Sequence, residues 1–193
     1  MFNNHILSIY RYDKEEVFVT ANYFKKGLKN NIKCIYISSD KNNELLTSEL
    51  RSKILDLDKY IKSGQLLLLN QKDVYVKNDT IPIEQIIKTA DFFEDESKKQ
   101  GFTNIIFSGE PFLTNTKNQE IVINYENHLD KYLNGKKFIV LCHYSESKYQ
   151  EETLLKMIKS HSSIIIYGEH RSLANKNIPN KYDEAINFIL ESK

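Results

Sequence analysis

Short apolar runs alternate along this chain with longer segments in which apolar residues recur every three or four positions. Apolar runs of this length, flanked by polar turns, are typical of strands that are buried on both faces. The segments in which apolar residues recur every three or four positions are typical of helices that bury one side. The runs that predict strands cover residues 5–10, 32–38, 66–69, 104–107, 138–144 and 163–167.

Helices are predicted between these strands, and a last helix over 182–191 follows a polar stretch that ends at Pro179. The first helix begins at Asp13, and Glu16, three residues later, would complete a capping box. Residues 74–77 fit either an edge strand or an extended connection, and a polar loop is expected at 114–118. The other predicted helical segments cover residues 43–54, 60–63, 82–100, 121–132 and 151–159.

Strands that alternate with helices of this length predict an α/β fold of three layers. We expect a mainly parallel sheet of about six strands with helices on both faces. The chain is expected to form a single domain over residues 1–193, with a core at about 5–168 and a C-terminal helix at 182–191.

The net charge, the length of the apolar runs and the two cysteines argue against several classes of protein. The net charge is +1, and basic residues are interleaved with acidic ones, so no direct nucleic-acid contact is expected. The apolar runs are too short to span a bilayer, and no membrane contact is expected. Cys34 and Cys142 both lie inside apolar runs, which favours buried thiols and a cytoplasmic location over a disulfide framework.

The loop after the first predicted strand lacks a phosphate-binding sequence. A phosphate cradle needs glycines, whose backbone N–H groups can approach the anion, followed by Lys and Ser or Thr. Here the segment from Arg11 to Glu16 holds no glycine and several acids, which repel anions at a helix start. Nucleoside triphosphate binding at this position is therefore not expected.

Candidate binding residues gather where the predicted strands end, because ligands of open parallel sheets bind outside the carboxyl ends of the strands. Tyr10 ends the first strand, Glu110 follows the fourth, and Cys142 and Tyr144 lie at the end of the fifth. Phenols, a carboxylate and a thiol at one rim would suit a small, weakly polar ligand.

The adjacent Cys142 and His143 do not predict a hydrolase. Neighbouring strand residues point to opposite faces, so this thiol and this imidazole cannot form a catalytic pair on a regular strand. Packing of Cys142 as an inert core residue is as good an explanation as pocket lining.

A metal site would have to gather His5, His161 and Cys142. Both histidines are expected at the amino-terminal edge of the sheet, whereas Cys142 lies roughly 13 Å along its strand at ~3.3 Å per residue. No CxxC or HxxxH cluster occurs. We therefore expect no metal and no other cofactor, with His161 as a cation near a helix C-terminus and His5 bonded to nearby backbone.

These residues together resemble the MEDS domain, the sensory domain named for methanogens, methylotrophs and the dichloromethane regulator DcmR. Two positions depart from the family pattern, which has Tyr-Asp at Tyr144-Ser145 and His-Pro at His161-Ser162. The resemblance spans 5–168 and is carried by the order of His5 and Tyr10, Glu15-Glu16, Phe24-x-x-Gly27-Leu28, Cys34 to Ile37, Gly101, Gly109-Glu110, Tyr125-Glu126, Leu141-Cys142-x-Tyr144, Leu154-Leu155 and His161.

The resemblance implies a non-catalytic sensor of simple hydrocarbon derivatives, with a RecA/KaiC-like core that has lost its phosphate loop. It adds Tyr125 and Glu126 to the candidates, so the predicted ligand-binding set is Tyr10, Glu110, Tyr125, Glu126, Cys142 and Tyr144. No kinase, receiver or helix-turn-helix segment flanks the domain in this sequence. We therefore expect signalling through a partner, such as a histidine kinase or a transcription regulator, and a homodimer is possible. A divergent enzyme that uses Cys142 or Glu110, and a ligand-free interaction scaffold, remain alternatives.

Overall fold

A seven-stranded sheet forms the centre of the protein, in a computed structural model that describes residues 5–75, 82–111, 119–172 and 178–191. The strand order is β3-β2-β4-β5-β1-β6-β7; β1 to β6 pair in parallel, and β7 is antiparallel to β6. The strands are β1 (His5–Tyr10), β2 (Lys33–Ser38), β3 (Leu66–Asn70), β4 (Ile105–Gly109), β5 (Ile139–Ser145), β6 (Ser163–Ile166) and β7 (Glu169–Ser172).

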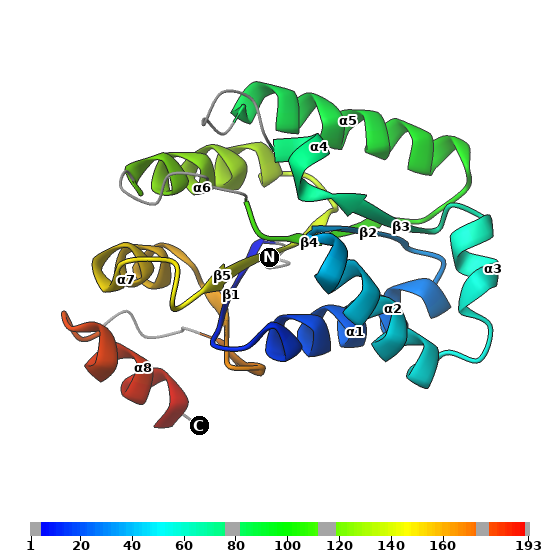
Figure 1. Cartoon of the computed structure of the whole chain (residues 1–193). Coiled ribbons are helices and arrows are strands. Elements are labelled where there is room, and N and C mark those ends of the chain that lie inside the picture. Colours follow the sequence, from blue (N-terminus) through cyan, green and yellow to red (C-terminus); the bar gives the residue numbers. More distant parts are fainter. Residues whose placement is uncertain (1–4, 76–81, 112–118, 173–177, 192–193) are drawn as a thin grey trace.

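Helices cover both faces of this sheet (Figure 1). The described helices are α1 (Asp13–Lys29), α2 (Asp40–Lys53), α3 (Leu57–Lys62), α4 (Gln71–Tyr75), α5 (Ile83–Lys99), α6 (Glu120–Leu133), α7 (Glu151–Ser160) and α8 (Tyr182–Glu191). One face packs against α1, α2 and α3, and the other against α5, α6, α7 and α8, which gives two separate apolar clusters. Among the described residues, no helix is long and apolar enough to cross a membrane. The predicted three-layer α/β class is confirmed.

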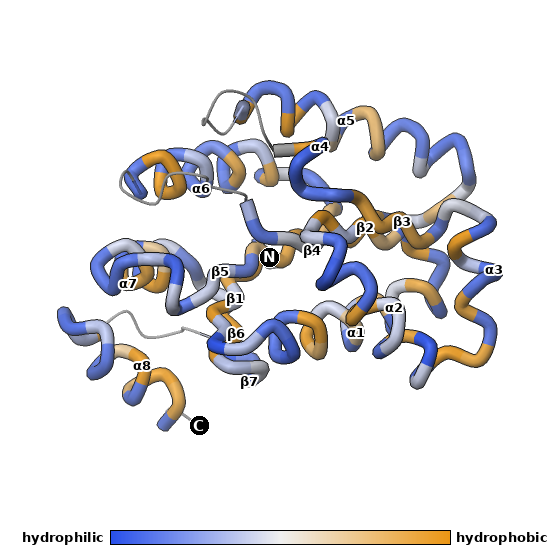
Figure 2. The backbone as a smooth tube through the Cα atoms, in the orientation of Figure 1, coloured by the Kyte–Doolittle hydropathy of each residue, from blue (hydrophilic) through white to orange (hydrophobic). Residues whose placement is uncertain are grey.

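Apolar strands lie between amphipathic helices, as the alternation of sequence patterns predicts (Figure 2). Along β5, Val140, Cys142 and Tyr144 face the α6 side, whereas Leu141 packs on the α1 side. His143 also points to the α1 side, where it contacts Thr20. The prediction that Cys142 and His143 face opposite ways is confirmed, and it excludes a direct pair between them.

Three local predictions are wrong. Part of the polar stretch before Pro179 forms the edge strand β7. A strand or extended connection was expected over 74–77, but its first two residues belong to the short helix Gln71–Tyr75, and residues 76–77 lie outside the described residues. Glu16 does not cap α1; Glu15 does, since its carboxylate accepts from the backbone N–H groups of Arg11 and Tyr12. The loop expected at 114–118 lies outside the described residues.

Gly109 ends β4 at a point where the neighbouring strand comes very close. A Cβ at this position would lie 2.5 Å from the Ile37 carbonyl oxygen of β2, and backbone cannot move aside without disturbing the sheet. At Gly27 of α1, the closest atom to an added Cβ is instead Ile106 Cδ1, at 2.7 Å, which is the end of a flexible side chain.

We expect Gly109→Ala to lower the free energy of unfolding by about 1–3 kcal/mol, the usual cost of overpacking. Gly27→Ala is the matched control and should cost less. Urea unfolding of both variants measures the difference; equal losses would contradict the close backbone approach.

Glu16 is a fully buried carboxyl on the α1 face of the sheet. Its Oε1 accepts a 2.7 Å hydrogen bond from the Tyr36 hydroxyl, and its Oε2 accepts a 3.1 Å bond from Asn42 Nδ2. Burial, and then the negative charge of Glu110, raise the pKa of Glu16 to about 8. Glu16 is therefore largely protonated in the folded protein at neutral pH.

Because the folded state holds the Glu16 proton more tightly than the unfolded state does, stability should fall as the pH rises from about 4.5 to about 8. Each pH unit inside this window removes up to about 1.4 kcal/mol. We expect Glu16→Gln to lack this decline, whereas Glu44→Gln, at an exposed position, should keep it. Unfolding curves at pH 5 and pH 8 test this, and parallel pH profiles for wild type and Glu16→Gln would contradict it.

Candidate functional site

The six predicted ligand-binding residues separate into three places. Tyr10 and Glu110 meet at the carboxyl edge of the sheet. Glu126 and Tyr144 meet in the interior, beside Cys142. Tyr125 lines an apolar cavity, and Cys142 lies in the wall of that cavity as well. The expected single rim pocket is therefore divided.

At the carboxyl edge, Glu110 is occupied by neighbours from this chain. Its Oε2 accepts a 3.2 Å hydrogen bond from the Tyr10 hydroxyl and lies 2.6 Å from Lys148 Nζ. Its Oε1 accepts from the backbone N–H of Ser145 at 3.4 Å. Burial, and then the Glu110 charge, raise the pKa of Tyr10, so its phenol stays protonated and donates to the carboxylate.

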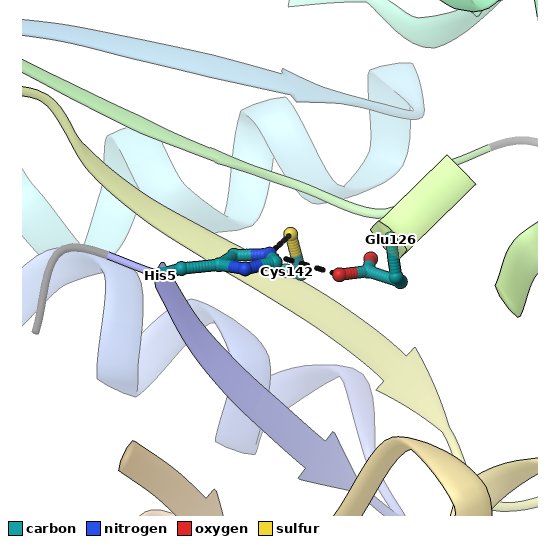
Figure 3. A group of neighbouring side chains, drawn as sticks. All are labelled: His5, Glu126 and Cys142. Atoms are coloured by element: carbon teal, nitrogen blue, oxygen red, sulfur yellow. Dashed lines mark hydrogen bonds and ion pairs between the residues drawn. The ribbon is translucent and has the colours of Figure 1, made fainter. Parts of the chain in front are cut away.

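In the interior, His5, Glu126 and Cys142 converge from three elements (Figure 3). His5 is the first residue of β1, Glu126 projects from α6, and Cys142 lies on β5. His5 Nε2 lies 2.9 Å from Glu126 Oε2 and 3.5 Å from Cys142 Sγ. All three residues are buried.

The expected separation of roughly 13 Å between His5 and Cys142 is wrong. It counted residues from the start of the fifth strand, but His5 pairs with Val140, which lies beyond that start. Cys142 is thus only two positions further along, on the same face as Val140. The His5 ring spans the remaining distance.

Two further residues complete the surroundings of the Glu126 carboxylate. The Tyr144 hydroxyl donates to Glu126 Oε1, and His161 Nε2 lies 3.4 Å from Glu126 Oε2. His161 follows α7 directly, and its ring centroid lies 4.6 Å from that of His5. His161 lies at the end of its helix, as expected, and its Nδ1 lies 2.8 Å from the Met157 carbonyl oxygen; the positive charge expected on its ring stays a prediction. His5 was expected to bond to backbone, but its partners are side chains.

Electrostatics in this cluster are dominated by the buried carboxylate. Burial alone would raise the pKa of Glu126, but the close contacts with His161 and His5 outweigh burial and lower that pKa. Burial likewise would lower the pKa of His5, and the carboxylates of Glu126 and Asp130 raise it instead. Burial and the Glu126 charge raise the pKa of Cys142 and of Tyr144 well above their ordinary values.

An apolar cavity of about 50 Å³ lies beside this cluster, between the sheet and helices α5 and α6. Cys142 forms part of its floor, and Tyr125, the residue before Glu126, forms part of its wall. Most of its other lining side chains are apolar; they include Ile86, Ala90, Phe93, Phe107 and Leu129.

A second buried polar group, on the α1 face, was not anticipated. The Ser108 hydroxyl lies 2.8 Å from His143 Nε2 and 2.8 Å from the Thr20 hydroxyl. All three residues are almost fully buried, and Ser108 also lines the apolar cavity. Burial lowers the pKa of His143 to about 3, which keeps the ring neutral. The only sign of this contact in the sequence was the prediction that His143 faces the side of the sheet opposite to Cys142.

An interior polar cluster thus lies beside a small apolar cavity on an α/β scaffold. Residues 4–162 match the family described as MEDS: MEthanogen/methylotroph, DcmR Sensory domain. The chain belongs to this family, and the predicted resemblance is confirmed. Its membership indicates a sensory role.

The sequence matches none of the curated proteins. Among solved structures, the flagellar accessory protein FlaH from Methanocaldococcus jannaschii aligns with a TM-score of 0.49 and 16% sequence identity. The alignment covers 84% of this chain and 69% of FlaH.

Alkylation measures whether Cys142 has a reactive thiolate. Because burial and Glu126 raise the pKa of the thiol, we expect slow modification by iodoacetamide near neutral pH in the folded protein. Cys34, whose pKa burial also raises, is the internal control and should react as slowly. Mass spectrometry after timed labelling gives both rates; rapid labelling of Cys142 alone would favour the enzyme hypothesis.

Proposed function

We propose that this protein is a non-catalytic sensor that binds a small, weakly polar organic molecule and passes the signal to a partner protein. The observation that carries this proposal is the apolar cavity beside Cys142. Membership of a sensory family supports it, because such a domain needs a place to receive its signal.

The size of the cavity restricts the class of ligand. Its volume is about 50 Å³, roughly a third of the ~150 Å³ apolar cavity that holds a benzene molecule in another protein. Molecules of roughly two or three non-hydrogen atoms would fit, in the range of methanol, methylamine or a one-carbon haloalkane. Simple hydrocarbon derivatives are the ligands that the family resemblance implies.

The cavity is a better candidate than the carboxyl edge for such a ligand. At the edge, Glu110 is paired with Lys148 and Tyr10, so a weakly polar molecule would have to displace charged or hydrogen-bonded groups. The walls of the cavity are mainly apolar, and burying apolar ligand surface there is favourable without such a loss.

Signal transfer would follow from the position of α6. Tyr125 contacts the cavity and the adjacent Glu126 is held by the interior cluster, so a ligand beside Tyr125 would bias the position of this helix. We propose that a partner, such as a histidine kinase or a transcription regulator, detects that change. The two buried, unpaired cysteines support a cytoplasmic setting for this exchange.

Ligand screening tests the proposal directly. We expect one class among small alcohols, amines, haloalkanes and short acids to raise the Tm. At a concentration 100 times Kd, binding stabilises the folded state by about 2.7 kcal/mol. For a chain of this size, that corresponds to a rise of roughly 5–10 °C.

Matched variants then locate the site. Ala90→Leu should fill the cavity and abolish the shift, whereas Lys88→Leu, at an exposed position of the same helix, should preserve it. Tyr10→Phe, at the carboxyl edge, should preserve it as well. A shift that survives Ala90→Leu but is lost in Tyr10→Phe would move the site to the edge, and no shift with any ligand class would favour a scaffold.

A further inference from the structure

We propose that His5, Glu126, Cys142 and His161 form a zinc-binding site. The ligand atoms would be Nε2 of both histidines, Oε2 of Glu126 and Sγ of Cys142. This site is separate from the apolar cavity, although Cys142 belongs to the boundary of both.

The ligand atoms of His5, Glu126 and Cys142 lie within 4.8 Å of one another, and His161 approaches this group through Glu126, so it would have to move toward the other two atoms to become the fourth ligand. Three of the separations are close to those of ligands around one tetrahedral ion. Zinc lies about 2.0–2.1 Å from nitrogen or oxygen ligands and about 2.3 Å from sulfur, which separates neighbouring ligand atoms by about 3.3–3.6 Å. The measured separations are 3.5 Å from Cys142 Sγ to His5 Nε2 and 3.4 Å from His161 Nε2 to Glu126 Oε2. The 2.9 Å between His5 Nε2 and Glu126 Oε2 requires a shift of only a few tenths of an ångström.

The atoms of these side chains that face away from the proposed ion make hydrogen bonds of the kind that usually orient metal ligands. A metal-bound histidine donates its other N–H to a carbonyl or carboxylate, which fixes the ring. His161 Nδ1 lies 2.8 Å from the Met157 carbonyl oxygen, and His5 Nδ1 lies 3.4 Å from Asp130 Oδ1. Tyr144 in turn donates to Glu126 Oε1, which leaves Oε2 for the centre.

Two of the atoms that face the proposed ion, Glu126 Oε2 and His161 Nε2, lack hydrogen-bond partners in the described part of the chain. Because a carbonyl oxygen can only accept, Nδ1 of His161 carries a proton in its bond to Met157. Nε2 of the same ring lies 3.4 Å from Glu126 Oε2, and neither atom makes a hydrogen bond with any described residue. Both residues are more than 90% buried, at 7% and 3% exposed. A cation between them would satisfy both.

The mixture of donors selects zinc from the common ions. Mg²⁺ and Ca²⁺ take oxygen ligands, whereas two imidazoles, a thiolate and a carboxylate suit four-coordinate Zn²⁺. The raised pKa of the Cys142 thiol does not oppose this, because an ion deprotonates the thiol that coordinates it. The ion would join β1, β5, α6 and the end of α7, and so stabilise the side of the sheet that holds the cavity.

Metal analysis of the wild-type protein tests the site without any substitution. We expect chelator-treated protein to take up about one equivalent of Zn²⁺ per chain, and to show a higher Tm with it. Co²⁺ in its place should give the intense visible bands of a tetrahedral ion and a near-ultraviolet thiolate-to-metal absorption. Failure to retain zinc, or bound Co²⁺ without the thiolate absorption, would overturn the proposal and leave a buried ion pair.

A pair of cysteine variants assigns the sulfur ligand. Cys34 and Cys142 are both buried and unpaired, but only Cys142 contacts His5. Cys142→Ser should lose the thiolate absorption of the Co²⁺ protein, and Cys34→Ser should keep it. Retention in Cys142→Ser would overturn the assignment; if that variant does not fold, the wild-type spectrum and zinc content still decide. Organic ligand binding is measured independently, so either proposal can fail alone.

Discussion

Burial of the Glu126 carboxylate is the constraint on which the arrangement of the α6 side depends. Removing an ionised group from water costs several kcal/mol even after relaxation, so such a group is retained only where partners surround it. Those partners come from separate parts of the fold: His5 from β1, Tyr144 from β5 and His161 from the end of α7. These contacts tie α6 to β1, to β5 and to the end of α7, in addition to the apolar packing on that face.

The sheet keeps two kinds of polar interior apart. On the α1 face, Glu16 with Tyr36, and His143 with Ser108, form groups in which the titrating member is neutral at pH 7, since burial dominates both pKa values. On the α6 face, the carboxylate remains charged because imidazoles compensate it. Glu126 Oε2 and His161 Nε2 of the second group lie 3.4 Å apart, and neither makes a hydrogen bond with a described residue. Cys142 of this group and Ser108 of the other both border the apolar cavity. The proposed ligand site and the proposed metal site therefore both lie around Cys142.

Apolar periodicity predicted the six parallel strands because their runs are nearly uniform in polarity; five of them are mostly buried, and β3 is largely half-buried. It could not predict β7, because Glu169–Ser172 are polar and largely exposed and this strand pairs with β6 mainly through its backbone. Period-two alternation also gave the opposite directions of Cys142 and His143 correctly. The alternation does not show how neighbouring strands are aligned, that is, which residue of one strand pairs with which residue of the next. The expected distance between His5 and Cys142 was wrong because this register was unknown.

Strand order explains why the interior cluster could not be derived from the chain alone. β1 lies between β5 and β6, so its first residue has Cys142 to one side and the residues that precede β6 to the other. His5 and His161 are more than 150 positions apart in sequence, yet their rings touch because these strands are neighbours. Helix α6, which packs on this face of the sheet, supplies Glu126. The proposed metal ligands come from two strands, a helix and a helix end, and such a set has no characteristic spacing, so a CxxC or HxxxH motif is not required for it.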